Sequence, residues 1–228
     1  MSNGKIQHPR LPTDRQRLAI IGDTGSGKTV AALWHLSHRN FDRIPWVVID
    51  YKGDENIEAI DRAEIRPLDW TPAKREFGLF VLRPLPEMDD EAVEDFLRRI
   101  YERENVGLWI DEGLMVDRSG WTKVLITQGR SKRIPLIMLS QRPVDVSRYL
   151  WSNSEYFQYF PSGDDRDSAV VANFVRGLRE RGTGDLPRYW SYYYDRGRKA
   201  LHTWKPVDAP ERSIERINEK LKQRRRFI

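Results

Sequence analysis

The sequence contains no cysteine among its 228 residues. Disulfides and thiolate metal sites both require cysteine, so neither can stabilise this protein. It also has no apolar run approaching the roughly 18 residues that a membrane-spanning helix needs, and its polar N-terminal stretch lacks the apolar centre of a signal peptide. We therefore expect a soluble protein with no transmembrane segment.

A large excess of one charge is also lacking, with 39 Lys and Arg residues against 34 Asp and Glu residues and a net charge of +5. This mild basic excess is compatible with nucleic-acid binding but does not identify it. No internal repeat or low-complexity linker is present. The length is sufficient for one α/β domain with a sizeable core.

One octapeptide, residues 22–29, is a complete match to the phosphate-binding loop pattern G-x-x-x-x-G-K-[ST]. An apolar run over 18–21 precedes it and an apolar-periodic stretch over 30–36 follows it, which is the strand–loop–helix order that the motif requires. We expect the octapeptide to bind the phosphates of ATP. Its residues are Gly22, Asp23, Thr24, Gly25, Ser26, Gly27, Lys28 and Thr29.

The residue types in this octapeptide suit a triphosphate. Glycines let the backbone wrap closely around phosphates, and the following helix adds the partial positive charge of its N-terminus. Lys28 can reach the β- and γ-phosphates during catalysis, and the Thr29 hydroxyl can ligate Mg²⁺. ATP and Mg²⁺ are therefore the predicted cofactors.

A second apolar run, 108–110, ends in the acids Asp111 and Glu112. An aspartate at such a strand end can hold the Mg²⁺ shell, as a Walker B aspartate does. Glu112, one residue further, can orient and deprotonate an attacking water. This pair favours ATP hydrolysis over transfer of a phosphate to a substrate hydroxyl.

A third apolar run, 136–139, is followed by Ser140 and Gln141. In an open α/β sheet the carboxyl ends of the strands face the bound ligand. We therefore expect the Gln141 amide to sense the γ-phosphate or the attacking water.

The order of the expected elements predicts an α/β fold with a mostly parallel sheet flanked by helices, followed by a β-hairpin and a helical tail. We divide the chain into a flexible N-terminal arm (1–14), an ATPase domain (15–205) and a basic C-terminal tail (206–228). Strands are expected over 18–21, 46–50, 77–82, 106–110, 134–139, 155–160, 190–194 and 200–204, and helices over 30–36, 88–104, 121–130, 164–178 and 211–226.

Taken together, the motifs resemble those of the FtsK–HerA superfamily of ring-forming, DNA-pumping ATPases. The similarity covers roughly 17–175, and it departs from the family pattern at Tyr51, where proline is usual, and at Ser140, where threonine is usual. The matching segments, in chain order, are 22–29, Asp50-Tyr51-Lys52, Asp111-Glu112, Gly129-Arg130 and Ser140-Gln141-Arg142-Pro143.

This resemblance implies a RecA-like P-loop NTPase fold of the ASCE type and ATP-driven translocation of double-stranded DNA of any sequence. It also implies a homo-oligomeric ring, a pentamer or a hexamer, in which Arg130 of a neighbour contacts the γ-phosphate, with Arg133 as second choice. The compact size is similar to genome-packaging ATPases of tailless, internal-membrane (tectivirus-like) bacteriophages. The resemblance therefore implies that the protein is located in the host cytoplasm or at the virion packaging vertex. It also implies vertex or portal-like membrane proteins as partners.

A pump that moves any sequence should contact DNA phosphates rather than base edges. An aromatic series, Tyr189-Trp190, Tyr192 to Tyr194 and Trp204, could stack bases, but its hairpin setting favours packing within the sheet. Basic candidates for phosphate contacts are Lys132, Arg133, Arg176, Arg179, Arg181, Arg196, Arg198, Lys199 and Arg224 to Arg226.

Two other functions remain open at this point. A small phosphotransferase of the P-loop kinase type would need a mobile lid, for which 176–188 is the candidate stretch. A filamentous-phage assembly or conjugation ATPase would usually carry a membrane segment.

Overall fold

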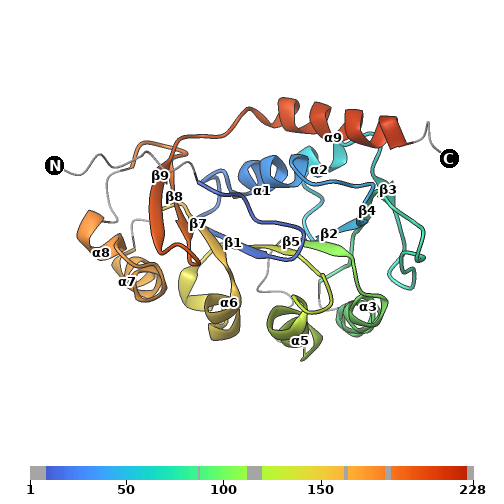
Figure 1. Ribbon diagram of the computed structural model, residues 1–228, viewed down its shortest axis with the longest axis horizontal. Coiled ribbons are helices and arrows are strands. Elements are labelled where there is room, and N and C mark those ends of the chain that lie inside the picture. Colours follow the sequence, from blue (N-terminus) through green and yellow to red (C-terminus); the bar gives the residue numbers. More distant parts are fainter. Residues whose placement is uncertain (1–8, 87, 112–119, 162–163, 183–185, 225–228) are drawn as a thin grey trace.

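The computed structural model describes residues 9–86, 88–111, 120–161, 164–182 and 186–224. Within these ranges the chain forms a nine-stranded sheet with helices on both faces (Figure 1). The strands are β1 (Arg17–Ile21), β2 (Trp46–Asp50), β3 (Glu64–Ile65), β4 (Leu79–Leu82), β5 (Gly107–Asp111), β6 (Leu136–Ser140), β7 (Tyr156–Tyr159), β8 (Ser191–Asp195) and β9 (Ala200–Trp204). The helices are α1 (Lys28–Ser37), α2 (Glu55–Glu58), α3 (Asp90–Arg103), α5 (Gly120–Gln128), the 3₁₀ turn η1 (Pro143–Asp145), α6 (Arg148–Asn153), α7 (Asp165–Phe174), α8 (Leu178–Arg181) and α9 (Pro210–Arg224).

The strand order β3-β4-β2-β5-β6-β1-β7-β8-β9 places β1 between β6 and β7. Neighbouring strands from β3 to β7 are parallel, and β8 and β9 continue the sheet as an antiparallel hairpin. Ile21 pairs with Ser140 and Asp50 pairs with Asp111, so β1, β2, β5 and β6 end at the same edge. The predicted α/β fold class is confirmed, and ligands of such sheets bind at this edge.

The central strands are apolar because water reaches neither face of the sheet. In Figure 1, α1, α2 and α9 cover one face, and α3, α5, α6 and α7 cover the other. Along β1, Leu18 and Ile20 pack in the cluster that includes α1, whereas Ala19 and Ile21 pack in the opposite cluster. Strands buried on both faces read as continuous apolar runs rather than alternating ones, which is why these were recognisable from the sequence.

The C-terminal helix α9 packs against α1. Ile217 and Leu221 are buried in the core cluster that includes α1. The Lys220 ammonium donates hydrogen bonds to the carbonyl oxygens of Ser37 (2.7 Å) and Arg39 (2.8 Å), where α1 ends. A cation at this position satisfies terminal carbonyls and complements the helix dipole. α9 is therefore fixed to the end of α1 that lies away from the octapeptide.

Some expected elements differ in extent from the observed ones. The helix predicted over 164–178 ends at Phe174, and α8 follows separately, because Gly177 between them adopts a left-handed backbone with φ of 87°. The two-residue strand β3 and the short helices α2 and α6 were not predicted. In the part of the chain that the structure describes, none of the helices is long and apolar enough to span a bilayer.

Three buried polar side chains connect α1 to β7 and β8. His35 Nε2 lies 2.9 Å from Gln158 Oε1, and the Gln158 amide nitrogen donates to Ser191 Oγ at 3.0 Å. Burial lowers the pKa of His35 from 6.5 to about 3, because the charged imidazolium would lose its hydration. The imidazole is therefore neutral near pH 7 and donates from Nε2 to the glutamine oxygen.

We predict that this burial makes folding stability fall as the pH drops below about 6.5. The folded pKa of His35 lies below the unfolded value, so the unfolded chain binds a proton there that the folded chain does not hold. The loss from this group between about pH 6.5 and about pH 4.5 is on the order of 2 kcal/mol of unfolding free energy. Urea titrations of the protein and of His35→Leu across this range measure it; parallel pH dependences for the two proteins would contradict the prediction.

Candidate functional site

The predicted phosphate-binding loop connects β1 to α1 at the carboxyl edge of the sheet. Gly25 and Gly27 have left-handed backbones, with φ of 77° and 99°. At Gly22 a Cβ atom would lie only 2.6 Å from the Cβ of Phe160, so a side chain cannot be accommodated without displacing the chain that follows β7. Three of the motif's glycines are thus required by the path of the backbone.

The loop also leaves polar groups positioned for an anion. No side chain caps α1 at its N-terminus, and its first turn contains no acidic residue. Ser26 Oγ is buried without a hydrogen-bond partner among the described residues. The Lys28 ammonium lies back over the loop and donates to the carbonyl oxygen of Asp23 at 2.7 Å. An uncapped helix N-terminus with glycine-rich turns and an adjacent lysine is the arrangement that binds phosphates, so the residues fit a triphosphate.

Asp111, the predicted metal-binding aspartate, lines the same cavity as Thr29. It ends β5 and is only 3 % exposed. The neighbouring carboxylate of Asp50 is engaged differently, because one of its oxygens accepts hydrogen bonds from the backbone N–H groups of 52–54, at 2.9 to 3.3 Å. Its other oxygen lies 3.4 Å from Nε of Arg83. Asp50 thus shapes the turn after β2.

The side chains of Thr29 and Asp111 suit a Mg²⁺ ion that is bound together with a nucleotide. They do not suit a metal ion that is held by protein side chains alone. Among the described residues, no three His, Asp or Glu side chains are grouped as a metal cluster. Mg²⁺ commonly takes one carboxylate and one hydroxyl, together with nucleotide phosphates and water. Thr29 and Asp111 provide that pair.

Gln141, the predicted sensor, contacts the loop directly. Thr24 Oγ1 donates a hydrogen bond to its side-chain oxygen at 3.2 Å. This contact connects the chain after β6 to the loop after β1, and Ser140 lines the cavity beside them. The structure therefore brings Gln141 together with the loop. The predicted base, Glu112, lies outside the described residues, directly after Asp111.

Arg130 lies at the edge of the sheet where the parallel strands begin, opposite the carboxyl edge that carries the loop of its own chain. It follows α5, and its Nη1 is 3.7 Å from a carboxylate oxygen of Glu155, just before β7 begins. Glu155 also binds Arg17 at the start of β1, with 2.7 Å between Arg17 Nη2 and Glu155 Oε1. The Arg130 side chain is 65 % exposed. Within one chain, Arg130 is therefore not part of the loop site.

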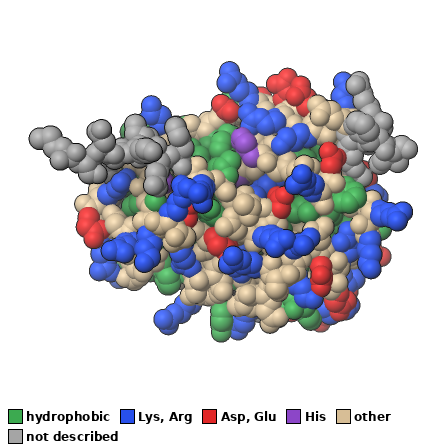
Figure 2. Space-filling view, in the orientation of Figure 1, with side chains coloured by type: hydrophobic (Ala, Val, Ile, Leu, Met, Phe, Trp, Pro, Cys, Tyr) green, Lys and Arg blue, Asp and Glu red, His purple; other side chains and the backbone are tan. Residues whose placement is uncertain are grey.

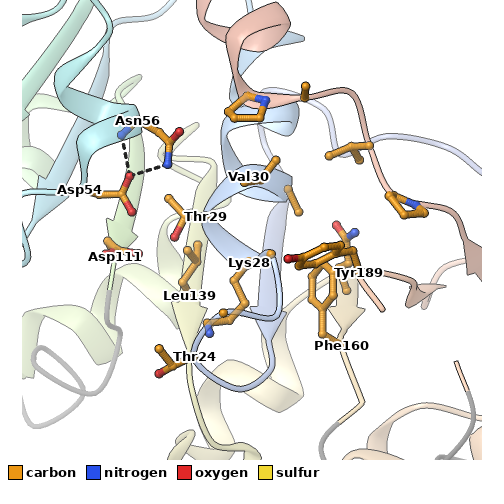
Figure 3. Close-up of a pocket in the computed structure, with 18 of the residues that line it drawn as sticks. Thr24, Lys28, Thr29, Val30, Asp54, Asn56, Asp111, Leu139, Phe160 and Tyr189 are labelled. Carbon is orange, nitrogen blue, oxygen red and sulfur yellow. Dashed lines mark hydrogen bonds between the residues drawn. The ribbon is translucent and has the colours of Figure 1, made fainter. Parts of the chain in front are cut away.

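A cavity of about 630 Å³ adjoins the loop and α1 (Figure 3). Figure 3 shows Asp54, Asn56 and Asp111 on one side of α1, and Phe160 and Tyr189 on the other. Asp54 caps α2 by accepting hydrogen bonds from the backbone and side-chain nitrogens of Asn56, at 2.9 and 3.0 Å. The segment 205–210, between β9 and α9, also lines the cavity.

Sequence reasoning missed several of these lining residues. Asp54 could have been noticed, because aspartate is a preferred N-cap residue of helices. The assignment of Tyr189 to sheet packing was wrong. Tyr192 to Tyr194 are buried in β8 as predicted, but Tyr189 precedes the strand and lines the cavity instead.

Similarity to known proteins extends along nearly the whole chain. No protein-family model matches the sequence. The DNA packaging ATPase P9 of Enterobacteria phage PRD1 is 39 % identical over 217 residues, which cover 92 % of this chain and 95 % of that protein.

Solved structures share the fold at lower identity. The genome packaging NTPase B204 of Sulfolobus turreted icosahedral virus 2, in complex with sulfate, superposes with a TM-score of 0.68 at 14 % identity, covering 86 % of this chain and 98 % of that one. EssC (ATPases 2 and 3) of Geobacillus thermodenitrificans gives a TM-score of 0.64 at 16 % identity, covering 94 % of this chain and 45 % of that one. The predicted resemblance to viral packaging ATPases is confirmed, and the chain belongs to the family of viral DNA-packaging ATPases.

Proposed function

We propose that the chain is the ATPase of a genome-packaging motor that drives double-stranded DNA as a ring of identical subunits. The observation that carries this proposal is its kinship with a phage DNA-packaging ATPase along nearly the whole of both chains. The loop between β1 and α1 supports it independently, because its geometry fits a triphosphate.

ATP binds with its phosphates against residues 22–29. Lys28 contacts the β- and γ-phosphates, and the amide groups at the start of α1 contact the remaining phosphate oxygens. Thr29 and Asp111 hold Mg²⁺, which supplies positive charge to the phosphates when bound. Both residues line the cavity beside the loop, which supports this assignment.

Glu112 is the proposed general base. It directly follows Asp111 in the sequence, and Asp111 ends β5 at the edge of the sheet that carries the loop. A glutamate carboxylate can take a proton from an attacking water. Gln141 is the proposed sensor of the γ-phosphate. Its hydrogen bond to Thr24 supports this role, because the bond links the loop directly to the segment after β6.

Arg130 completes the site of a neighbouring subunit. Its distance from the loop of its own chain and its high exposure support a role in trans. An arginine delivered across an interface stabilises the charge that develops on the transferred phosphoryl group. A closed ring, a pentamer or a hexamer, provides such an interface at every site.

DNA contacts are expected through backbone phosphates and not through base edges. Figure 2 shows Lys and Arg side chains spread over one face with acids between them. Some of the predicted basic residues already have partners within the chain: Lys132 pairs with the carboxylate of Glu104, and Arg196 donates to the carbonyl oxygens of Trp151 and Ser152. Arg176, Arg179 and Arg181 are exposed, and the hydrogen bonds of Arg179 and Arg181 go to the uncharged side chains of Asn173 and Thr203. We take these three as the stronger candidates, because uncharged partners leave their positive charge available to phosphates. We place the motor at the packaging vertex, with vertex or portal-like membrane proteins as partners.

A phosphotransferase is less well supported, because it would need a mobile lid. The candidate lid, 176–188, forms hydrogen bonds to the rest of the fold in the part that the structure describes. Tyr192 donates a hydrogen bond from its hydroxyl to the carbonyl oxygen of Gly182 at 3.0 Å. Arg181 donates to Thr203 at 3.3 Å. Both contacts join the end of α8 to the β8–β9 hairpin, so this part of the stretch is held against the sheet rather than extended over the cavity.

We predict that Glu112→Gln retains ATP binding and reduces ATP turnover by at least about a hundredfold, because the amide cannot accept the proton of the attacking water. Phosphate release in the presence of duplex DNA and equilibrium ATP binding are the two measurements. The matched control is Glu94→Gln, on α3, which should retain turnover. Full hydrolysis by Glu112→Gln would reject Glu112 as the base.

We predict that Arg130→Ala and Lys28→Ala subunits, each inactive alone, partly restore ATP hydrolysis when they are mixed. A mixed ring contains interfaces where an intact loop meets an intact arginine, whereas neither pure ring does. ATPase rates over a series of mixing ratios measure this effect.

The matched control for this experiment is Arg98→Ala, on α3, where the arginine forms exposed ion pairs with Asp95 and Glu102 on its own helix. This variant should be active alone. If assembled mixtures of the two inactive variants show no recovery at any ratio, the site is not shared between subunits.

A further inference from the structure

The cavity beside the loop has two chemically different ends. Lys28, Thr29 and Asp111 lie at the end towards β5 and β6, where the phosphate chemistry is assigned. Phe160 follows β7 and Tyr189 precedes β8. Since β6 and β7 flank β1 on opposite sides, these aromatic residues lie across α1 from the catalytic end, as Figure 3 shows.

The two aromatic rings stand directly beside the start of α1. A Cβ atom placed on Gly27 would lie 3.4 Å from Cδ1 of Tyr189 and 3.7 Å from Cε1 of Phe160. The Phe160 side chain is only 4 % exposed, and its backbone N–H donates to the carbonyl oxygen of Ile21 at 2.8 Å. Phe160 is therefore a fixed wall, and Tyr189, which is 44 % exposed, presents accessible aromatic surface.

Tyr189 is held in place by a strained turn. Its φ of 67° is left-handed, a conformation that residues with a Cβ rarely adopt. The turn is closed by a hydrogen bond from the N–H of Trp190 to the carbonyl oxygen of Pro187 at 3.0 Å. The Arg188 guanidinium lies 4.7 Å from the centre of the Tyr189 ring. Backbone strain of this kind gathers at sites that bind ligands.

Segment 205–210 lines the same cavity as these rings and is anchored at both ends. It begins directly after β9 and leads into α9, which is fixed to α1 by Lys220. Pro206 and Pro210 restrict its backbone. Within it, Asp208 pairs with Arg216 of α9 at 3.4 Å. Val207 and Ala209 add apolar surface to this end of the cavity.

We propose that the base of the bound nucleotide stacks on Tyr189, against the wall formed by Phe160 and beneath segment 205–210. This inference rests on the proposed function, which places the phosphates on the loop. A planar aromatic base attached to a triphosphate spans the charged and the apolar ends of one cavity, and base–aromatic stacking is favourable for any base. Tyr189 therefore contributes affinity for the nucleoside part of the ligand and none for its phosphates.

Calorimetric titration with two ligands, ATP and inorganic tripolyphosphate, separates the two ends of the cavity. In Tyr189→Ala, the dissociation constant for ATP should rise at least tenfold, while that for tripolyphosphate stays within about twofold of the unaltered protein. Tyr189→Phe should keep the ATP affinity of the unaltered protein, since the aromatic ring suffices for stacking. Tyr149→Ala is the matched control, because Tyr149 is similarly exposed (46 %) but lies on α6, outside the cavity.

A second variant, Val207→Trp, places a large side chain in the cavity beside segment 205–210. It should likewise weaken the binding of ATP but not the binding of tripolyphosphate. Unchanged ATP affinity in both variants would overturn the base site. An equal loss of affinity for both ligands in both variants would also overturn it, since the effect would then lie in the phosphate-binding loop. Failure of the unaltered protein to bind either ligand would instead reject the proposed function.

Discussion

The close passage of the loop backbone between β1, the start of α1 and the chain after β7 is the constraint on which the rest of the site depends. Gly22 can approach Phe160 only because it has no side chain, and Gly25 and Gly27 turn where other residues would be strained. This path fixes where α1 begins, and therefore where Lys28 and Thr29 stand. It also brings both the catalytic strand ends and the aromatic wall within reach of a single ligand.

The strands around the loop could be predicted because each is buried on both faces. The runs over 18–21, 46–50, 108–110 and 136–139 are apolar almost throughout, and the polar residues at their ends indicate the carboxyl edge of the sheet from the sequence alone. The glycines of the octapeptide predict the tight turns of its backbone from the sequence alone. The element types and the location of Asp111 and Gln141 followed from these local signals.

Other features depend on contacts between distant parts of the chain, which local patterns do not encode. β3 has two residues and α6 has six, too few for a periodicity to appear. Tyr189 belonged to an aromatic series typical of a strand, and a left-handed backbone at this residue separates it from that strand. Segment 205–210 lines the cavity and leads into α9, which docks on α1, far away in the sequence. The position of Arg130 opposite the loop likewise follows from the direction of α5.

Together with the proposed packaging function, that position supports our central proposal, which is that hydrolysis belongs to an assembled ring engaged with DNA and not to a single chain. The most direct test measures ATP hydrolysis with and without long duplex DNA, alongside the mass of the protein in solution. We expect assembled protein to hydrolyse ATP faster when duplex is added, whatever its sequence, and monomers to hydrolyse little. Equal rates with and without duplex in the assembled state, or full hydrolysis by monomers, would contradict this claim.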